Sequence, residues 1–324
     1  MIKKYPKKLP HGIMFHYFHD DKHHLAQGSI SQEDFEDILQ FIGLKRILSP
    51  DEWVRRLNIG ELKPEDVCLT FDHGLLCQFD VALPVMEKYN LKAFWFVYSS
   101  PFEGGLCKRE IYRIFQSKFF SNIDEFYQAF FERIFNSKFA DKAHGVLKED
   151  DIRQYKKIFQ FYSDNDVKFR FIRDRAMTKS EFEEFMYPMI VDYGTSLAEL
   201  SKNLWLSNEH LKYLTKRGHS VGLHSYSHPM ILVNLSPEEQ WEEYSKNYNH
   251  IKRVTTQSPT AVSHPNNSYN EDTLEVLSRL DISCGFMSNM FPQHAGSQLN
   301  RSKYEIARED HSNIMKMKSA SSTS

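Results

Sequence analysis

Two histidines, His224 and His228, have the residue type and spacing that point most directly to chemistry in this sequence. They lie four residues apart in GHSVGLHSYSHP, residues 218–229, behind a short apolar segment. Two imidazoles at this separation can share one metal ion. The alternative is a pair of surface histidines in a turn.

A second segment, VCLTFDHG at residues 67–74, favours the metal site. Its apolar, β-rich run ends in Asp72 and His73 and is followed by the turn-permissive Gly74. This pattern predicts a buried strand that carries a carboxylate and an imidazole to its C-terminal end. A metal-assisted hydrolase needs such a set: about three N or O ligands, an open position for water and a nearby carboxylate base.

The two segments resemble the hallmark motifs of the polysaccharide deacetylase (NodB-homology) family, which has a strand ending in TFDDG and a later GHxxGxHxxxH. In this chain the motifs read TFDHG and GHSVGLHSYSH. The resemblance continues outside them, at residues 82–86, 91–97, 205–218, 267–270 and 273–280. It implies an α/β fold, the NodB-type distorted (β/α) barrel, and metal-dependent hydrolysis of an N-acyl group on a sugar.

The resemblance also assigns roles at the two motifs. It implies Asp72 as the general base and His73, His224 and His228 as metal ligands, with His73 standing where the family has a second aspartate. The histidine would complete a three-histidine set suited to Zn²⁺ with water as the fourth ligand. Alternatively, the longer, neutral imidazole displaces a site shaped for a carboxylate and impairs catalysis.

A third family element, an arginine followed two residues later by proline, is altered here. Pro265 is kept, but Ser263 stands where the arginine that orients the catalytic carboxylate would be. Arg308, in a strand-like run at residues 304–311, is the candidate replacement, with an exposed strand end as the alternative. The resemblance implies His311 as the general acid and the backbone N–H of Asn266 as an oxyanion donor. We therefore expect Pro265, Asn266 and Arg308 to line the substrate site.

His16 and His19 end the first predicted strand, residues 12–18, in FHYFHD. Since the C-terminal end of this strand should also open on the pocket, we expect both to contact the substrate. Each could instead be a core or rim histidine. Gly222, inside the predicted histidine strand, is expected to allow close packing.

Composition sets the class of protein. The chain has 324 residues, 41% apolar and 14% aromatic, enough for a substantial core. Its 41 basic and 43 acidic residues are interspersed, so no nucleic-acid partner is expected. No apolar run approaches the ~20 residues of a membrane span. The start shows no signal-peptide pattern, which predicts a cytoplasmic protein, and four separated cysteines fit reduced thiols.

Strands alternating with helices predict a largely parallel sheet or barrel with its site at the strand C-termini. Helices are expected at 31–41 and 50–57, and a long stretch after residue 97 is far beyond an ordinary connection. We predict a barrel from residues 1–100 and 204–318, an inserted helical lid subdomain at 101–203, and a disordered tail at 319–324. Helical patterns at 119–135, 155–162 and 179–187, with aromatic stripes, would form the insertion's own core, shape the pocket, or both.

The sequence thus predicts a metal-dependent hydrolase, with Zn²⁺ best suited, that removes an acetyl or formyl group from an amino sugar. The expected substrate is a nucleotide-linked or lipid-linked intermediate of surface-glycan synthesis, such as lipopolysaccharide biosynthesis. Two alternatives stay open: a catalytically impaired member that binds glycan, and a hydrolase of a non-sugar C–N bond. The oligomeric state is not indicated.

Overall fold

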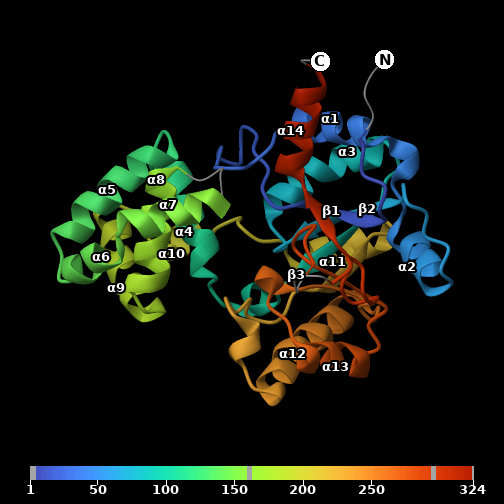
Figure 1. Cartoon of the computed structure of the whole chain (residues 1–324). Coiled ribbons are helices and arrows are strands. Elements are labelled where there is room, and N and C mark those ends of the chain that lie inside the picture. The colour runs from blue at the N-terminus through green and yellow to red at the C-terminus, as the bar shows by residue number, and fades with distance from the viewer. Residues whose placement is uncertain (1–4, 159–162, 293–296, 323–324) are drawn as a thin grey trace. The chain divides into compact units, whose positions relative to one another are not determined.

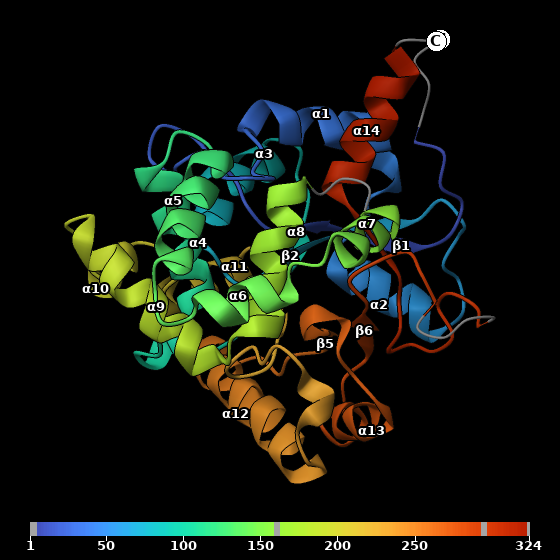
Figure 2. The same cartoon turned by 60° about the vertical axis from the view of Figure 1, so that its left-hand side comes forward.

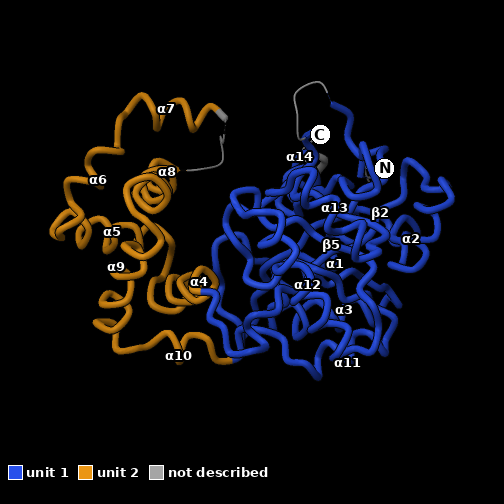
Figure 3. Tube along the Cα trace, turned by 90° about the horizontal axis from the view of Figure 1, so that it is seen from below, with its two compact units in different colours: residues 1–107, 203–324 blue, residues 108–202 orange. Residues whose placement is uncertain are grey.

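The computed structural model describes residues 5–158, 163–292 and 297–322. The chain divides into two compact units, residues 1–107 with 203–324, and residues 108–202 (Figure 3). The prediction from the sequence began the insertion at residue 101. In the structure, residues 98–107 stay with the first unit, where the Ser100 N–H donates to the Tyr226 carbonyl over 2.9 Å.

Seven parallel strands form the first unit's sheet, in the order β6-β5-β4-β3-β2-β1-β7. Their bounds are β1 His11–Phe15, β2 Val67–Asp72, β3 Ala93–Val97, β4 Ser220–Leu223, β5 Ala261–Ser263, β6 Cys284–Phe286 and β7 Arg308–Asp310. The two edges approach each other: Phe286 and Ile306 form a parallel bridge, and the Arg308 N–H donates to the Asn289 carbonyl. The result is a nearly closed barrel, which confirms the predicted (β/α) barrel of the NodB type.

Helices surround this barrel (Figures 1 and 2). They are α1 Gln32–Ile42, α2 Pro50–Asn58, α3 Leu83–Lys88, α11 Asn208–Lys216, α12 Pro237–Thr255, α13 Glu271–Arg279 and α14 His311–Ser322. Ser31 caps α1 as its position predicts, since its side chain accepts from the Asp34 N–H. Helices α1, α3 and α14 lie together, and α12 and α13 lie side by side (Figures 1 and 2).

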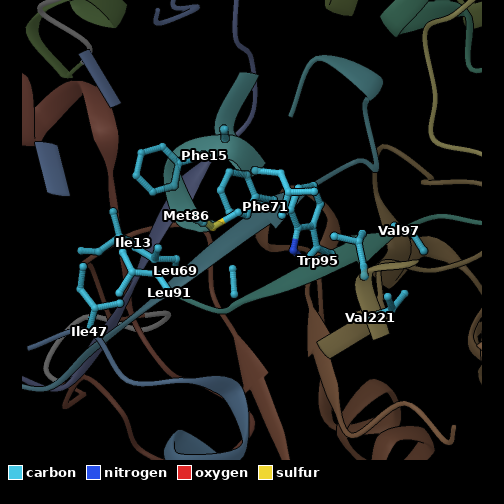
Figure 4. Close-up of a cluster of buried hydrophobic side chains, with 14 of the residues drawn as sticks. Ile13, Phe15, Ile47, Leu69, Phe71, Met86, Leu91, Trp95, Val97 and Val221 are labelled. Carbon is cyan, nitrogen blue, oxygen red and sulfur yellow. The ribbon is translucent and has the colours of Figure 1, made fainter. Parts of the chain in front are cut away.

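Aromatic rings on neighbouring strands pack together on the face of the sheet that the helices cover (Figure 4). Phe71 of β2 stacks on Trp95 of β3 with ring centroids 4.6 Å apart, and Phe15 of β1 stacks on Phe71 at 5.4 Å. All three rings are fully buried. Because Phe71 directly precedes Asp72, this ladder anchors the end of the strand that carries the predicted base.

Several element boundaries differ from the expectation. The first strand ends at Phe15, short of residue 18, and the run at 304–311 is a strand only at Arg308–Asp310. The predicted disordered tail lies in α14 as far as Ser322, while residues 323–324 fall outside the described part. The helix is anchored before the tail, where Ile314 is fully buried and α14 packs on α1.

The second unit is helical, with α4 Lys108–Phe119, α5 Ile123–Phe135, α6 Ala140–Val146, α7 Glu149–Ile158, α8 Asp164–Phe171, α9 Lys179–Asp192 and α10 Leu197–Leu200. The single helix expected at 119–135 is broken before α5, because Asn122 caps that helix. Residues 159–162 of the helix expected at 155–162 lie outside the described part. Five buried phenylalanines form much of this unit's interior: Phe126, Phe130, Phe169, Phe182 and Phe185. No helix in the described ranges is long and apolar enough to span a bilayer.

Candidate metal and hydrolytic site

The turn after β2 presents His73 by means of an unusual backbone. His73 has φ of 78° and Gly74 has φ of 65°, two left-handed conformations in succession. A Cβ on Gly74 would lie 2.8 Å from Cγ1 of Val97, so only glycine fits there. A non-glycine residue in this region costs energy, and such positions cluster at functional sites.

Three histidines converge beside this turn. One ligand nitrogen each of His73, His224 and His228 lies within 4.8 Å of the others, and all three side chains are buried. The ring centroids are 5.3 Å apart for His73 and His224, 4.9 Å for His73 and His228, and 4.8 Å for His224 and His228. The sequence-based ligand set is therefore brought together by the ends of β2 and β4.

The loop that joins the last two histidines is held from two sides. The His228 N–H donates to Ser225 Oγ over 3.0 Å. Glu243 of α12 accepts from the backbone N–H groups of Tyr226, at 3.0 Å, and Ser227, at 2.8 Å. Gly222 lies just before this loop, and a Cβ there would meet the Ala261 carbonyl at 2.7 Å, which confirms the expected close packing.

The donor set fits a metal such as zinc. Nδ1 of His224 lies 2.8 Å from the Ser263 carbonyl, which can only accept, so Nδ1 carries the proton and Nε2 keeps its lone pair. Within the described residues, the buried Nε2 has no hydrogen-bond partner. Burial lowers the pKa of His224 to about 4, so the imidazole is neutral at pH 7, as a ligand must be.

Asp72 is clamped beside the histidines. Arg308 donates from Nη1 to Oδ1 over 2.7 Å and from Nη2 to Oδ2 over 2.8 Å, and Ser263 Oγ donates to Oδ2 over 3.1 Å. Burial by itself raises the pKa of Asp72, but the positive charge of Arg308 and the hydrogen bonds that it donates outweigh burial and hold that pKa below its usual range. The carboxylate is therefore ionised.

Arg308 is not placed to contact a substrate. Its side chain is 0% exposed, and its guanidinium also donates from Nε to the Met287 carbonyl. The expected substrate contact is corrected on this point, because the group is enclosed by the barrel. The contact with Asp72 is the one that a carboxylate-orienting arginine would make.

His16 and His311 occupy different surroundings. His16 Nε2 lies 3.8 Å from Oδ2 of Asp72, and its ring is 5.0 Å from that of His73. His311 begins α14, stacks on Phe15 at 5.8 Å and has Nε2 3.2 Å from the Gly28 carbonyl. Of the two, His16 is the one that contacts the base and a metal ligand.

The other expected substrate contacts lie on loops. His19 Nδ1 is 3.0 Å from Ser29 Oγ. Pro265 is buried, whereas Asn266 is exposed, with φ of 51° and side-chain bonds to the carbonyls of Pro229 and Met230. Asn266 is thus tied to the segment that follows His228.

Sequence reasoning missed an aromatic pair at the site. Trp205 donates from Nε1 to the Tyr98 hydroxyl over 2.7 Å, and the Tyr98 ring lies 5.5 Å from that of His228 and 6.1 Å from that of His73. Trp205 also bridges Leu75 in antiparallel fashion, two residues beyond His73. The only sequence signal was that both aromatics flank the insertion.

The fold and site define a parallel α/β barrel with a buried histidine cluster beside a clamped carboxylate at its strand C-termini. The profile of the family described as polysaccharide deacetylase matches residues 146–285, a range that includes the second motif and begins after the first. Residues 146–285 are therefore assigned to a polysaccharide deacetylase domain. A search of curated proteins gave no match.

Solved structures share this fold at low identity. The Streptococcus pyogenes deacetylase PplD in complex with acetate has 17% identity and a TM-score of 0.54 over 96% of this chain and 98% of that one. IcaB from Ammonifex degensii has 13% identity and a TM-score of 0.51 over 97% of each chain. A de-N-acetylase from Aggregatibacter actinomycetemcomitans has 10% identity and a TM-score of 0.52, over 95% of this chain and 99% of that one.

Proposed function

We propose that this chain is a zinc-dependent carbohydrate N-deacylase that removes an acetyl or formyl group from an amino sugar. The observation that carries the proposal is the buried triad His73, His224 and His228 next to the ionised, clamped Asp72. These histidines would hold the ion. A bound zinc would polarise the acyl carbonyl and lower the pKa of a coordinated water.

The chain's own residues would handle the protons. Asp72, ionised and fixed in orientation, would accept a proton from the attacking water. His16 would pass this proton on to the departing amine, because its Nε2 faces Asp72 across 3.8 Å and its ring packs against His73. Burial lowers the pKa of His16 to about 3, so its imidazole is neutral at pH 7 and would take up the proton from Asp72 before it donates one. We prefer it to His311, the acid suggested by the family resemblance, whose ring nitrogens face the Gly28 carbonyl and Asp310.

Residues at the edge of the site would position the sugar. Asn266 follows Pro265 on the turn after β5 and is exposed, so it is a candidate contact for the acyl or sugar group. Trp205 is partly exposed and next to Tyr98, and an indole beside the site offers a flat surface for a sugar ring. We propose a nucleotide-linked or lipid-linked amino sugar of surface-glycan synthesis as the substrate class.

The test is release of acetate or formate from defined substrates. Metal-free and zinc-loaded protein would be incubated with N-acetylglucosamine oligomers and with a nucleotide-linked N-acetyl amino sugar. The proposal expects amine and acetate to form in equal amounts only with metal, and His224→Ala to abolish both. His144→Ala, an exposed histidine of α6, is the matched control.

The replacement of the family's second aspartate by His73 favours one alternative, an impaired member that binds glycan. It would give saturable glycan binding in calorimetry with no acid released under any metal. If the protein released acid only from an amide that is not part of a sugar, the non-sugar hydrolase would replace the proposal.

A further inference from the structure

Asp72, the proposed base, is held in place although this chain has Ser263 where the family has its arginine. Ser263 ends β5 at the arginine's position and is fully buried. Its Oγ donates to Oδ2 of Asp72 and accepts from Nη2 of Arg308 over 2.8 Å. A serine reaches only one carboxylate oxygen here, so the two-point contact comes from Arg308.

The path of the Arg308 side chain is unusual. Strand β7 is separated from β2 by β1, as the order β2-β1-β7 shows. The side chain must therefore cross β1 to reach Asp72. It does so at Gly12, the residue that pairs with Arg308 in the ladder.

Gly12 leaves the space that this crossing needs. A Cβ on Gly12 would lie 2.9 Å from Cγ of Arg308, closer than real Cβ contacts, and 3.2 Å from both Cδ of Arg308 and Cδ1 of Phe286. The arginine's remaining bonds fix it further, from Nε to the Met287 carbonyl and from Nη1 to Thr70 Oγ1 over 3.3 Å. Arg308, Gly12 and Ser263 thus form one packed arrangement around the base.

We propose that Arg308 is the positioning residue for Asp72, an arginine relocated from β5 to β7, and that Gly12 and Ser263 are the small residues that admit it. Arg308 acts through Asp72 and does not touch the substrate. Bidentate pairing of arginine with carboxylate fixes orientation as well as charge, and loss of orientation by about 1 Å can cost about 100-fold in rate.

Relocating the arginine tests the proposal. Arg308→Met should lower kcat about 100-fold with KM and zinc affinity changed less than about threefold, since only the base is misplaced. The double variant Ser263→Arg with Arg308→Ala should recover at least about tenfold of that loss. Arg301→Met, on the exposed side of the same segment, is the control and should keep the parent's kcat.

Gly12→Ala provides a second test, in which Arg308 and its positive charge are kept. It should lower kcat in the parent, because the new methyl displaces the side chain of Arg308, and should lower it clearly less in the relocated double variant, where only the 3.2 Å contact with Phe286 Cδ1 remains. Equal effects in both backgrounds would overturn the role of Gly12. Parent-like kcat in Arg308→Met, or a folded double variant without recovery, would overturn the role of Arg308.

Crystal structures separate this inference from the proposed function. The Asp72 carboxylate should be rotated or displaced in Arg308→Met and restored in the double variant, whatever the substrate is. If the parent protein hydrolyses none of the substrates, the proposed function fails. The crystal structures then still show whether Arg308 positions Asp72. If Arg308→Met does not fold, Arg308→Lys takes its place, and an unmoved Asp72 there would contradict the proposal.

Discussion

We propose that His73 sets the metal preference of the site. Imidazole suits zinc, whereas carboxylate suits harder ions such as Mn²⁺ and Mg²⁺. His73→Asp restores the family motif, so we expect it to raise the affinity for Mn²⁺ relative to Zn²⁺ by about tenfold or more. Competition titrations of the two ions measure the ratio. An unchanged ratio would mean that His73 does not bind the metal.

The acid is assigned to His16 on geometry. General acid catalysis contributes typically about 10²–10⁴-fold, so His16→Asn should lower kcat by that order. His311→Asn should lower it far less, because His311 contacts Gly28 and Phe15. Steady-state kinetics with an amino-sugar substrate compare the variants. A larger loss for His311→Asn would return the acid role to that residue.

The two motifs could be placed from the sequence because each is contiguous, and strand ends in a parallel sheet meet at one edge. Arg308 could be proposed because the family's arginine is missing at Ser263, and in the structure it does contact Asp72. The contact of His16 with Asp72 could not be predicted, because it depends on how the barrel closes. The role of His311 stays a prediction from the family resemblance. A run that looked like strand is three residues long and passes directly into α14.

Both segments that lead to the insertion are hydrogen-bonded to the loops that carry the histidine cluster. In the segment that leads into the insertion, the Ser100 N–H donates to the Tyr226 carbonyl. In the segment that follows the insertion, the Leu206 N–H donates to the Gly74 carbonyl over 2.9 Å. Residues 98–107 and 203–206 therefore belong to the barrel's site, and the helices of residues 108–202 are a separable unit.

We therefore expect deletion of residues 108–202, bridged by a flexible Gly/Ser linker, to leave a folded barrel that binds zinc. The substrate affinity should fall sharply, since we propose that the helical unit selects the substrate as a lid. Circular dichroism and zinc calorimetry check the two claims. A barrel that folds but no longer binds zinc would place a ligand within the deleted helices.

At the scale of the molecule, buried neutral histidines make stability depend on pH. Burial lowers the pKa of His11 and of His264 to about 4, from 6.5 when unfolded. Between these values the unfolded chain binds protons that the folded chain does not, so stability is full above about pH 6.5 and falls as the pH drops towards 4.

Each of these histidines should cost about 2 kcal/mol of stability between pH 7.5 and pH 5. Urea unfolding of the metal-free protein at the two pH values measures the loss. His264→Asn should reduce that loss by about 2 kcal/mol relative to the exposed-histidine control His144→Ala. Identical losses in the two variants would show that His264 is not buried in its neutral form.

We propose that the imidazoles of His73, His224 and His228 form a zinc site. X-ray absorption at the zinc edge, on protein loaded with one equivalent of zinc, tests it most directly. We expect three nitrogen ligands at about 2.0–2.1 Å from the zinc, with an oxygen as the remaining ligand. The spectrum of His224→Ala should differ clearly from that of the parent. Sulfur ligands, an all-oxygen shell, or the same spectrum in His224→Ala would contradict it.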